Sequence, residues 1–286
     1  MEPDVLRYTA FAAGPDGGNP AGVVLDAAAL SDADMLAIAE RVGYAETVFV
    51  TGVTDDRVLV RYFSPAAEVP FCGHATVALA VVLAERDGVG PRVFVTAAGD
   101  VALDTALDEH GAVQVAMTSV EPDLREFDPA RLLALLGLTP DDVADGYPVL
   151  ESYAGNWNPV VVLEDRELFH QFRFDPVALA DLKRERGWTG TVTVLHPTRP
   201  GEYEARNLFP VGRITEDPAT GSAAASTGAY LRAIGRARAG DRVVIRQGRH
   251  VGRPSILLVD VTASGGITVR GGATPIAGWS DTAPEP

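Results

Sequence analysis

A repeat at long spacing is the feature of this sequence that most constrains its fold. Three short segments of the first half recur, in the same order, in the second half. The pairs are 19–25 with 158–163, 61–65 with 206–210, and 72–76 with 217–221. The first pair is 139 residues apart and the other two are each 145 residues apart. Repeats of solenoid proteins are much shorter, so this spacing predicts a diverged duplication that forms two related domains.

Each half is expected to place one buried helix against a sheet. Segments 75–84 and 222–231 are apolar on nearly every side, and a helix of that kind must be buried all round in a water-soluble protein. Further helices are expected at 32–43, with Ser31 as N-cap and Gly43 as terminator, and near 129–136 and 176–186. Alternation of apolar and polar residues predicts strands at 5–12, 21–25, 47–51, 57–63, 92–96, 101–107, 112–117, 160–163, 191–195, 202–208, 242–247, 256–261 and 267–270.

These elements predict an α+β protein with two similar domains, 1–120 and 121–286. A variant in which the last strands return to the first domain stays open, and 281–286 is expected to be a loose tail. With 47% hydrophobic and 22% charged residues, the chain has the composition of a soluble globular protein.

Charge and cysteine content exclude several classes of function. The net charge of −15 argues against nucleic acid as a partner, because phosphates would be repelled. The first residues lack a signal-peptide pattern and no stretch is apolar enough to span a membrane, so we expect a cytoplasmic protein with no membrane partner. A single cysteine, Cys72, allows neither an intrachain disulfide nor catalysis by two thiols within one chain.

Two predicted helix starts, Gly73-His74 and Gly221-Ser222, come from equivalent places in the two halves. The N-terminus of a helix offers free N–H groups and a positive dipole end, so two facing starts would hold a carboxylate and stabilise charge delocalised into it. Chemistry at a carbon acid needs that arrangement. Taken singly, each glycine is better explained by a tight turn, and it is the pairing of the two helix starts that favours an anion site.

Four side chains near these segments are candidates for chemistry, each with a simpler alternative. Glu46 lies at a helix-to-strand junction among apolar neighbours, which suits a general base, although an exposed loop acid is the commoner role. His74 would bind substrate or shuttle a proton, or would only cap its helix. The simpler alternative for Asp217 is an acid near a helix start with no role in catalysis. The simpler alternative for Cys72 is a small buried hydrophobic residue.

We expect neither metal nor cofactor. The other histidines, His110, His170, His196 and His250, show no ligand spacing. The chain has no Gly-x-Gly-x-x-Gly motif after a strand, no phosphate-binding loop and no nucleophile elbow, so no nucleotide or flavin site is indicated.

The same motifs resemble those of the PhzF family of phenazine-biosynthesis-like isomerases, which are related in fold to diaminopimelate epimerase. The resemblance runs over nearly the whole chain, through segments 11–23, 45–47, 61–76, 216–223 and 247–255. It implies two pseudo-symmetric domains, each a curled, mostly antiparallel sheet around a central helix, with the active site between them, no cofactor and a homodimeric assembly.

The resemblance also implies roles for individual residues. Glu46 matches the residue that removes a proton from carbon and helps to return it, in members that isomerise trans-2,3-dihydro-3-hydroxyanthranilate. His74, Asp217 and Ser222 match other active-site positions, and Gly73 and Gly221 match glycines that bind the substrate carboxylate. Related epimerases use two thiols, whereas Cys72 is the one thiol at this site. In the repeat, the residue 145 positions after Cys72 is Asp217, which is not a thiol.

We therefore expect a cofactor-independent isomerase of a small carboxylate, often derived from an amino acid. Glu46, His74 and Asp217 would carry the catalysis, and Gly73, Gly221, Ser222 and Cys72 would contact the substrate. Two alternatives stay open: an epimerase or racemase that depends on Cys72, and a small-carboxylate binding protein without catalytic activity.

Overall fold

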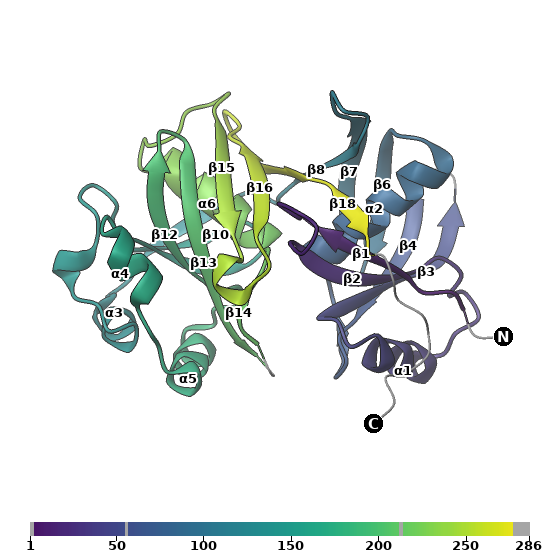
Figure 1. Cartoon of the computed structure of the whole chain (residues 1–286), viewed down its shortest axis with the longest axis horizontal. Coiled ribbons are helices and arrows are strands. Elements are labelled where there is room, and N and C mark those ends of the chain that lie inside the picture. Colours follow the sequence, from purple (N-terminus) through teal and green to yellow (C-terminus); the bar gives the residue numbers. More distant parts are fainter. Residues whose placement is uncertain (1–2, 55–56, 212–213, 277–286) are drawn as a thin grey trace.

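The computed structural model describes residues 3–54, 57–211 and 214–276. Two lobes lie side by side, and in each a curled sheet wraps around one helix (Figure 1). These central helices are α2, Gly73–Asp87, and α6, Gly221–Ala233. The predicted α+β class and both central helices are confirmed.

The sheet of the first lobe starts from a hairpin and adds strands on one side. Its strands are β1 (Leu6–Ala10), β2 (Asn19–Val24), β3 (Glu46–Thr54), β4 (Arg57–Phe63), β6 (Pro91–Thr96), β7 (Gly99–Leu107) and β8 (Val113–Thr118), with the short β5 (Glu68–Val69) against β4. Neighbours in this order pair antiparallel, except the parallel pairs β2–β3 and β4–β6.

The second lobe repeats this order. Its strands are β10 (Leu150–Tyr153), β11 (Trp157–Val162), β12 (Val192–Arg199), β13 (Glu202–Val211), β15 (Arg242–Gln247), β16 (Ser255–Asp260) and β17 (Thr268–Gly271), with β14 (Ile214–Asp217) against β13. The parallel pairs are β11–β12 and β13–β15, at the same places in the order as in the first lobe. Two sheets with one pairing pattern support the duplication inferred from the repeat.

The strand register corrects one part of that repeat. Phe63 faces Glu68 across β4 and β5, and the equivalent Leu208 faces Glu216 across β13 and β14. Glu216 therefore corresponds to Glu68 at a spacing of 148, because the second hairpin is three residues longer. Helices α2 and α6 begin at the same spacing, which makes Thr220, and not Asp217, the counterpart of Cys72.

The two lobes exchange strands at their junction. After β8 the chain enters the second lobe, where β9 (Asp123–Glu126) pairs with β10. After β17 it returns, and β18 (Ala273–Pro275) pairs with β1. Strands β8 and β17 pair with each other, so one continuous sheet links the lobes. The last strand thus lies against the first one.

Local sequence signals explain where the helices begin and end. Helix α1 (Asp32–Val42) starts at the predicted capping box of Ser31 and Asp34 and ends at Gly43, whose φ of 70° is left-handed. Along α2 every residue from His74 to Ala84 is buried, as its all-round apolar sequence predicts. The core around α2 and α6 is continuous through both lobes.

Shorter helices cover the outer faces of the sheets. Helix α1 covers the first lobe, and α3 (Ala130–Leu135), α4 (Arg166–Gln171) and α5 (Pro176–Arg186) cover the second. Strands β5, β9, β10, β14 and β18 and helix α4 were not expected from the sequence, because each is too short to show a period. The expected tail at 281–286 lies outside the described residues.

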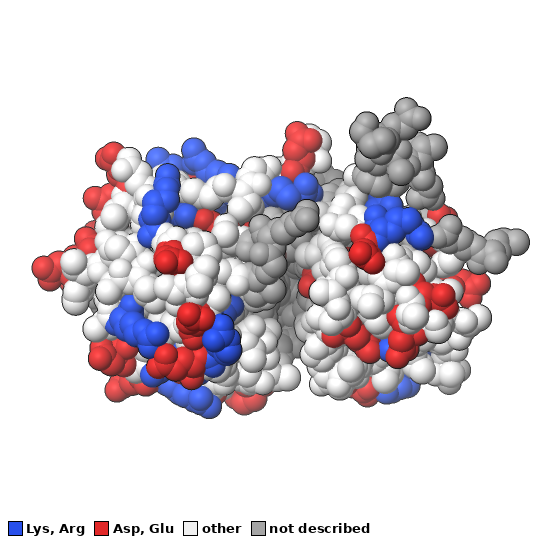
Figure 2. All heavy atoms as spheres, turned by 90° about the horizontal axis from the view of Figure 1, so that it is seen from below, with Lys and Arg blue, Asp and Glu red and all other residues white. Residues whose placement is uncertain are grey.

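Charged side chains of both signs lie on the face seen in Figure 2, among the residues that the structure describes. Acidic and basic side chains are interspersed there over both lobes. Among the described residues, no helix is long and apolar enough to cross a bilayer.

Candidate active site

A cavity of about 160 Å³ is lined by residues of both lobes, and all seven candidate residues contribute to its wall. Glu46, Cys72, Gly73 and His74 come from the first lobe, and Asp217, Gly221 and Ser222 come from the second. The structure therefore brings together every site residue that the sequence singled out.

Backbone geometry places Glu46 at the cavity. It is the first residue of β3 and pairs in parallel with Ala21 of β2, three residues after the left-handed Gly43 that ends α1. A parallel strand that starts beside the N-terminus of α2 directs this carboxylate toward Cys72 and His74. The side chain of Glu46 keeps 21% exposure, so the carboxylate can reach a molecule in the cavity.

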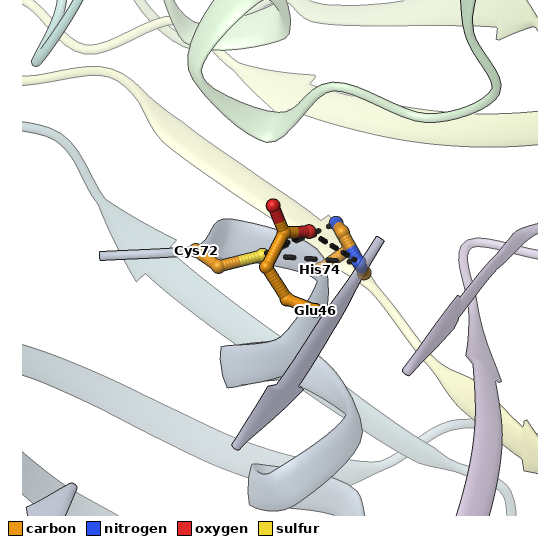
Figure 3. A group of neighbouring side chains, drawn as sticks. All are labelled: Glu46, Cys72 and His74. Atoms are coloured by element: carbon orange, nitrogen blue, oxygen red, sulfur yellow. Dashed lines mark hydrogen bonds and ion pairs between the residues drawn. The ribbon is translucent and has the colours of Figure 1, made fainter. Parts of the chain in front are cut away.

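Glu46, Cys72 and His74 converge, as Figure 3 shows. The Cys72 thiol donates a hydrogen bond to Oε2 of Glu46 with an S···O distance of 3.4 Å, and Nε2 of His74 lies 3.4 Å from the same oxygen. The Cys72 sulfur lies 3.3 Å from Nδ1 of His74. Burial, followed by the charge of Glu46, raises the pKa of the Cys72 thiol well above its usual value, so the thiol is neutral.

Asp217 faces the same cavity from the end of β14. One carboxylate oxygen accepts a hydrogen bond from Nδ2 of Asn19 at 2.9 Å, and the other accepts one from the Thr220 hydroxyl. Burial raises the pKa of this carboxyl to about 6; the charge of Glu46 adds to the rise, and His74, Thr220 and Asn19 oppose it. Asp217 is therefore poised to change charge close to neutral pH.

Gln247, at the end of β15, fixes the turn between Asp217 and α6. Its side-chain amide donates to the carbonyl oxygen of Asp217 at 2.6 Å and to the Thr220 hydroxyl at 2.9 Å. The next residue is Gly248, with φ of 81°, and a Cβ there would meet the carbonyl oxygen of Pro218 at 2.5 Å. Only glycine permits this approach, which brings the Gln247 side chain over the turn.

The raised pKa of Asp217 predicts how stability depends on pH. Its ordinary pKa is 3.8, so between about pH 4 and pH 6 the folded protein binds more protons than the unfolded chain, and this group destabilises the fold as pH rises. The free energy of unfolding is measured in urea for the wild type and for Asp217→Asn. As pH rises through this interval, the value for the variant minus the value for the wild type should increase by at most about 3 kcal/mol. A difference that does not change with pH would show that the pKa is not raised.

Two helix N-termini border the cavity. Gly73 and His74 begin α2, Gly221 and Ser222 begin α6, and in neither of these described helices does the N-cap side chain hydrogen-bond to the first turn. The N–H groups and positive dipole ends of both helices therefore remain for an anion in the cavity. The net charge of the chain is strongly negative, so this local field is what would hold a carboxylate.

Sequence reasoning missed several residues of the wall. Phe71 and Phe209 supply aromatic surface, and Asn156, Thr189, Gly190, Thr191, Ala45, Ala219 and Thr220 complete the lining. Asn19 and Gln247 position Asp217 from behind. Asn19 lies in the repeated Asn-Pro pair, and both residues lie in segments that resemble the family, but neither signal indicated this role.

This chain is similar to known proteins over almost its full length. Residues 8–278 match the family model PhzC-PhzF, described as phenazine biosynthesis-like protein. The chain belongs to this family. It is 30% identical to the uncharacterized isomerase YfhB of Bacillus subtilis, with 98% of each chain covered.

Solved structures agree with this assignment. A PhzF-family phenazine biosynthesis protein from Bacillus anthracis superimposes with a TM-score of 0.81 at 26% identity, covering 95% of this chain and 96% of that one. A predicted epimerase from Pseudomonas aeruginosa gives a TM-score of 0.82 at 27% identity, covering 96% and 97%. Together with the isomerase relatives, these matches make the protein an isomerase of the PhzF family with a diaminopimelate epimerase-like fold.

Proposed function

We propose that the protein isomerises a small carboxylate by removing a proton from carbon and returning it, with no cofactor. The observation that carries this proposal is the convergence on one cavity of a carboxylate base from the first lobe and two helix N-termini, one from each lobe. A base alone would face an unstabilised carbanion, and the helix ends offer the charge stabilisation that the step requires.

In this proposal Glu46 is the base and then the acid. The S–H of Cys72 and the imidazole of His74 both contact Oε2 of Glu46, which leaves Oε1 for a substrate proton. The substrate carboxylate would lie against the N–H groups of Gly73 and Gly221 and the side chain of Ser222. Negative charge that develops on the substrate would then be spread toward both helix N-termini.

His74 and Asp217 are proposed to exchange protons with the substrate and to orient it. His74 contacts Glu46, and burial raises the pKa of the Asp217 carboxyl to about 6. A group that titrates near neutral pH can both give and accept a proton under working conditions. Phe71 and Phe209 would pack against an unsaturated ring, which favours a compound similar to dihydro-hydroxyanthranilate.

The experiment that tests this function is deuterium incorporation from D2O, followed by mass spectrometry and NMR. The panel is dihydro-hydroxyanthranilate and small cyclic amino acids, each incubated with the wild-type protein and with buffer alone. Deuterium at a carbon of one compound supports the proposal and identifies the substrate class. Tight binding of a compound with no exchange would instead favour a binding protein.

Homodimeric assembly and a cytoplasmic location stay predictions.

An epimerase that uses Cys72 is the nearest alternative, and the site argues against it. The thiol is held neutral, and its counterpart in the second lobe is the hydroxyl of Thr220, which donates to Asp217. Cys72→Ala is therefore expected to keep its exchange rate within about 10-fold of wild type, whereas loss of a general acid or base costs about 10²–10⁴-fold. A loss in that larger range would make Cys72 a proton carrier.

A further inference from the structure

The three converging side chains of the first lobe are also three kinds of zinc ligand. A carboxylate, a thiol and an imidazole present one donor atom each within 4.8 Å of one another. Cys72 and His74 are buried, and all three line the cavity. The prediction of no metal site was based on the spacing of the four histidines other than His74. None of those four belongs to this trio.

The distances between the three donor atoms fit a tetrahedral metal. Zn²⁺ with bonds of about 2.3 Å to sulfur and about 2.0–2.2 Å to nitrogen and oxygen places its ligands about 3.5–3.7 Å apart for pairs with sulfur and about 3.3–3.5 Å for nitrogen with oxygen. Here Sγ of Cys72 lies 3.4 Å from Oε2 of Glu46 and 3.8 Å from Nε2 of His74. Nε2 and Oε2 are 3.4 Å apart, so these three distances are close to those around the ion (Figure 3). Nδ1 of His74 lies 3.3 Å from the same sulfur, so the imidazole ring must turn to aim the Nε2 lone pair at an ion that Cys72 also binds.

We propose that Glu46, Cys72 and His74 bind Zn²⁺ and that the bound ion inhibits the isomerase. As the Zn–S bond forms, the S–H bond of Cys72 breaks and the proton leaves to solvent. The thiolate and the carboxylate then balance the two positive charges, and neutral His74 contributes the lone pair of Nε2. Because all three ligands line the cavity, the fourth position is open to water or to a substrate carboxylate.

Inhibition follows from what the ion occupies. A Glu46 oxygen that coordinates Zn²⁺ no longer accepts a proton from carbon. This consequence rests on the proposed function, whereas binding of the metal does not. The three ligands are close together in the backbone of a single lobe, because Glu46 starts β3, Cys72 is the N-cap residue of α2 and His74 lies in its first turn.

Co²⁺ is the probe that tests the binding, because a tetrahedral Co²⁺ bound to thiolate absorbs by charge transfer from sulfur. Titration of the full chain with Co²⁺ should give a saturable band at one ion per chain, which added Zn²⁺ removes. Cys72→Ser, checked for folding by circular dichroism, should lack the band. It should bind Zn²⁺ more than about 100-fold more weakly, since losing a residue that only orients a ligand already costs about 10–100-fold.

The chain provides a matched control in its second lobe. His170 and His250 are 3.1 Å apart, and His170 lies 3.5 Å from Glu204, outside the active-site cavity. His250→Gln should keep the band and the Zn²⁺ affinity. No band in the wild type, an unchanged band in Cys72→Ser, or its loss in His250→Gln would each overturn the site.

The inhibitory effect has its own readout. Once a labelled compound is known, one equivalent of bound Zn²⁺ should stop deuterium exchange in the wild type, and a chelator should restore it. Exchange that continues with the Co²⁺ or Zn²⁺ site filled would overturn inhibition and leave the site itself in place.

Discussion

Replacing Glu46 by Gln is expected to lower turnover by about 10²–10⁴-fold while leaving the fold intact, because the amide cannot accept the substrate proton. Gln keeps the size of the side chain and an oxygen that can still accept from the Cys72 thiol. The urea midpoint should therefore change little. Turnover is measured with the compound that the exchange screen identifies.

Glu204→Gln is the matched control for this substitution. Glu204 is a carboxylate of similar burial, 16% exposed against 21% for Glu46, but it contacts His170 and Arg166 away from the active-site cavity. Its variant should turn over at the wild-type rate. Equal rates for Glu46→Gln and Glu204→Gln would remove Glu46 from the mechanism.

The largest stability effect is expected at Arg206, in the second lobe. Its guanidinium is 5% exposed, pairs with Glu216, donates to the carbonyl oxygens of Phe169 and Phe172, and stacks 3.8 Å from the ring centre of Phe172. Arg206→Met leaves the Glu216 carboxylate buried without its partner. Loss of one member of a buried pair costs about 3–5 kcal/mol, a large part of the stability of an ordinary domain.

The duplication supplies the comparison for this effect. Arg61 and Glu68 are the equivalent pair of the first lobe, at the same strand register, but their side chains are 29% and 37% exposed. Arg61→Met should therefore cost about 0–1 kcal/mol. Urea denaturation of both variants measures the two losses. Equal losses would show that burial does not set the strength of these pairs.

Much of the fold could be predicted because its signals are local or repeated. The capping box at Ser31, the all-round apolar helices and the echo of Arg61 at Arg206 each need only neighbouring residues or a comparison of two segments. The shift from 145 to 148 could not be predicted, since a hairpin that is three residues longer leaves no mark in composition. Only the strand register shows that Thr220 is the counterpart of Cys72.

The residues of the candidate site could be predicted for the same reason. The residues that hold them in position could not. Gly73 and Gly221 stand out as turn residues before apolar helices, whereas Asn19 and Gln247 act through contacts with residues far away in sequence. Asn158, the echo of Asn19, shows the limit of the repeat. It is fully buried and bonds to Thr191 and Ser226 within its own lobe, so equivalent positions have different tasks.

Glu46 is proposed to move a proton between its own carboxyl and a carbon of the substrate, and labelling from solvent reports that transfer at the reacting carbon. Wild-type protein and Glu46→Gln are incubated in D2O with the compound that the screen identifies, and deuterium at each carbon is read by NMR. The partly exposed Glu46 carboxyl exchanges its proton with solvent, so deuterium should enter with wild type and stay at the buffer level with Glu46→Gln. Equal labelling by the two proteins, or product that forms without label, would contradict the claim.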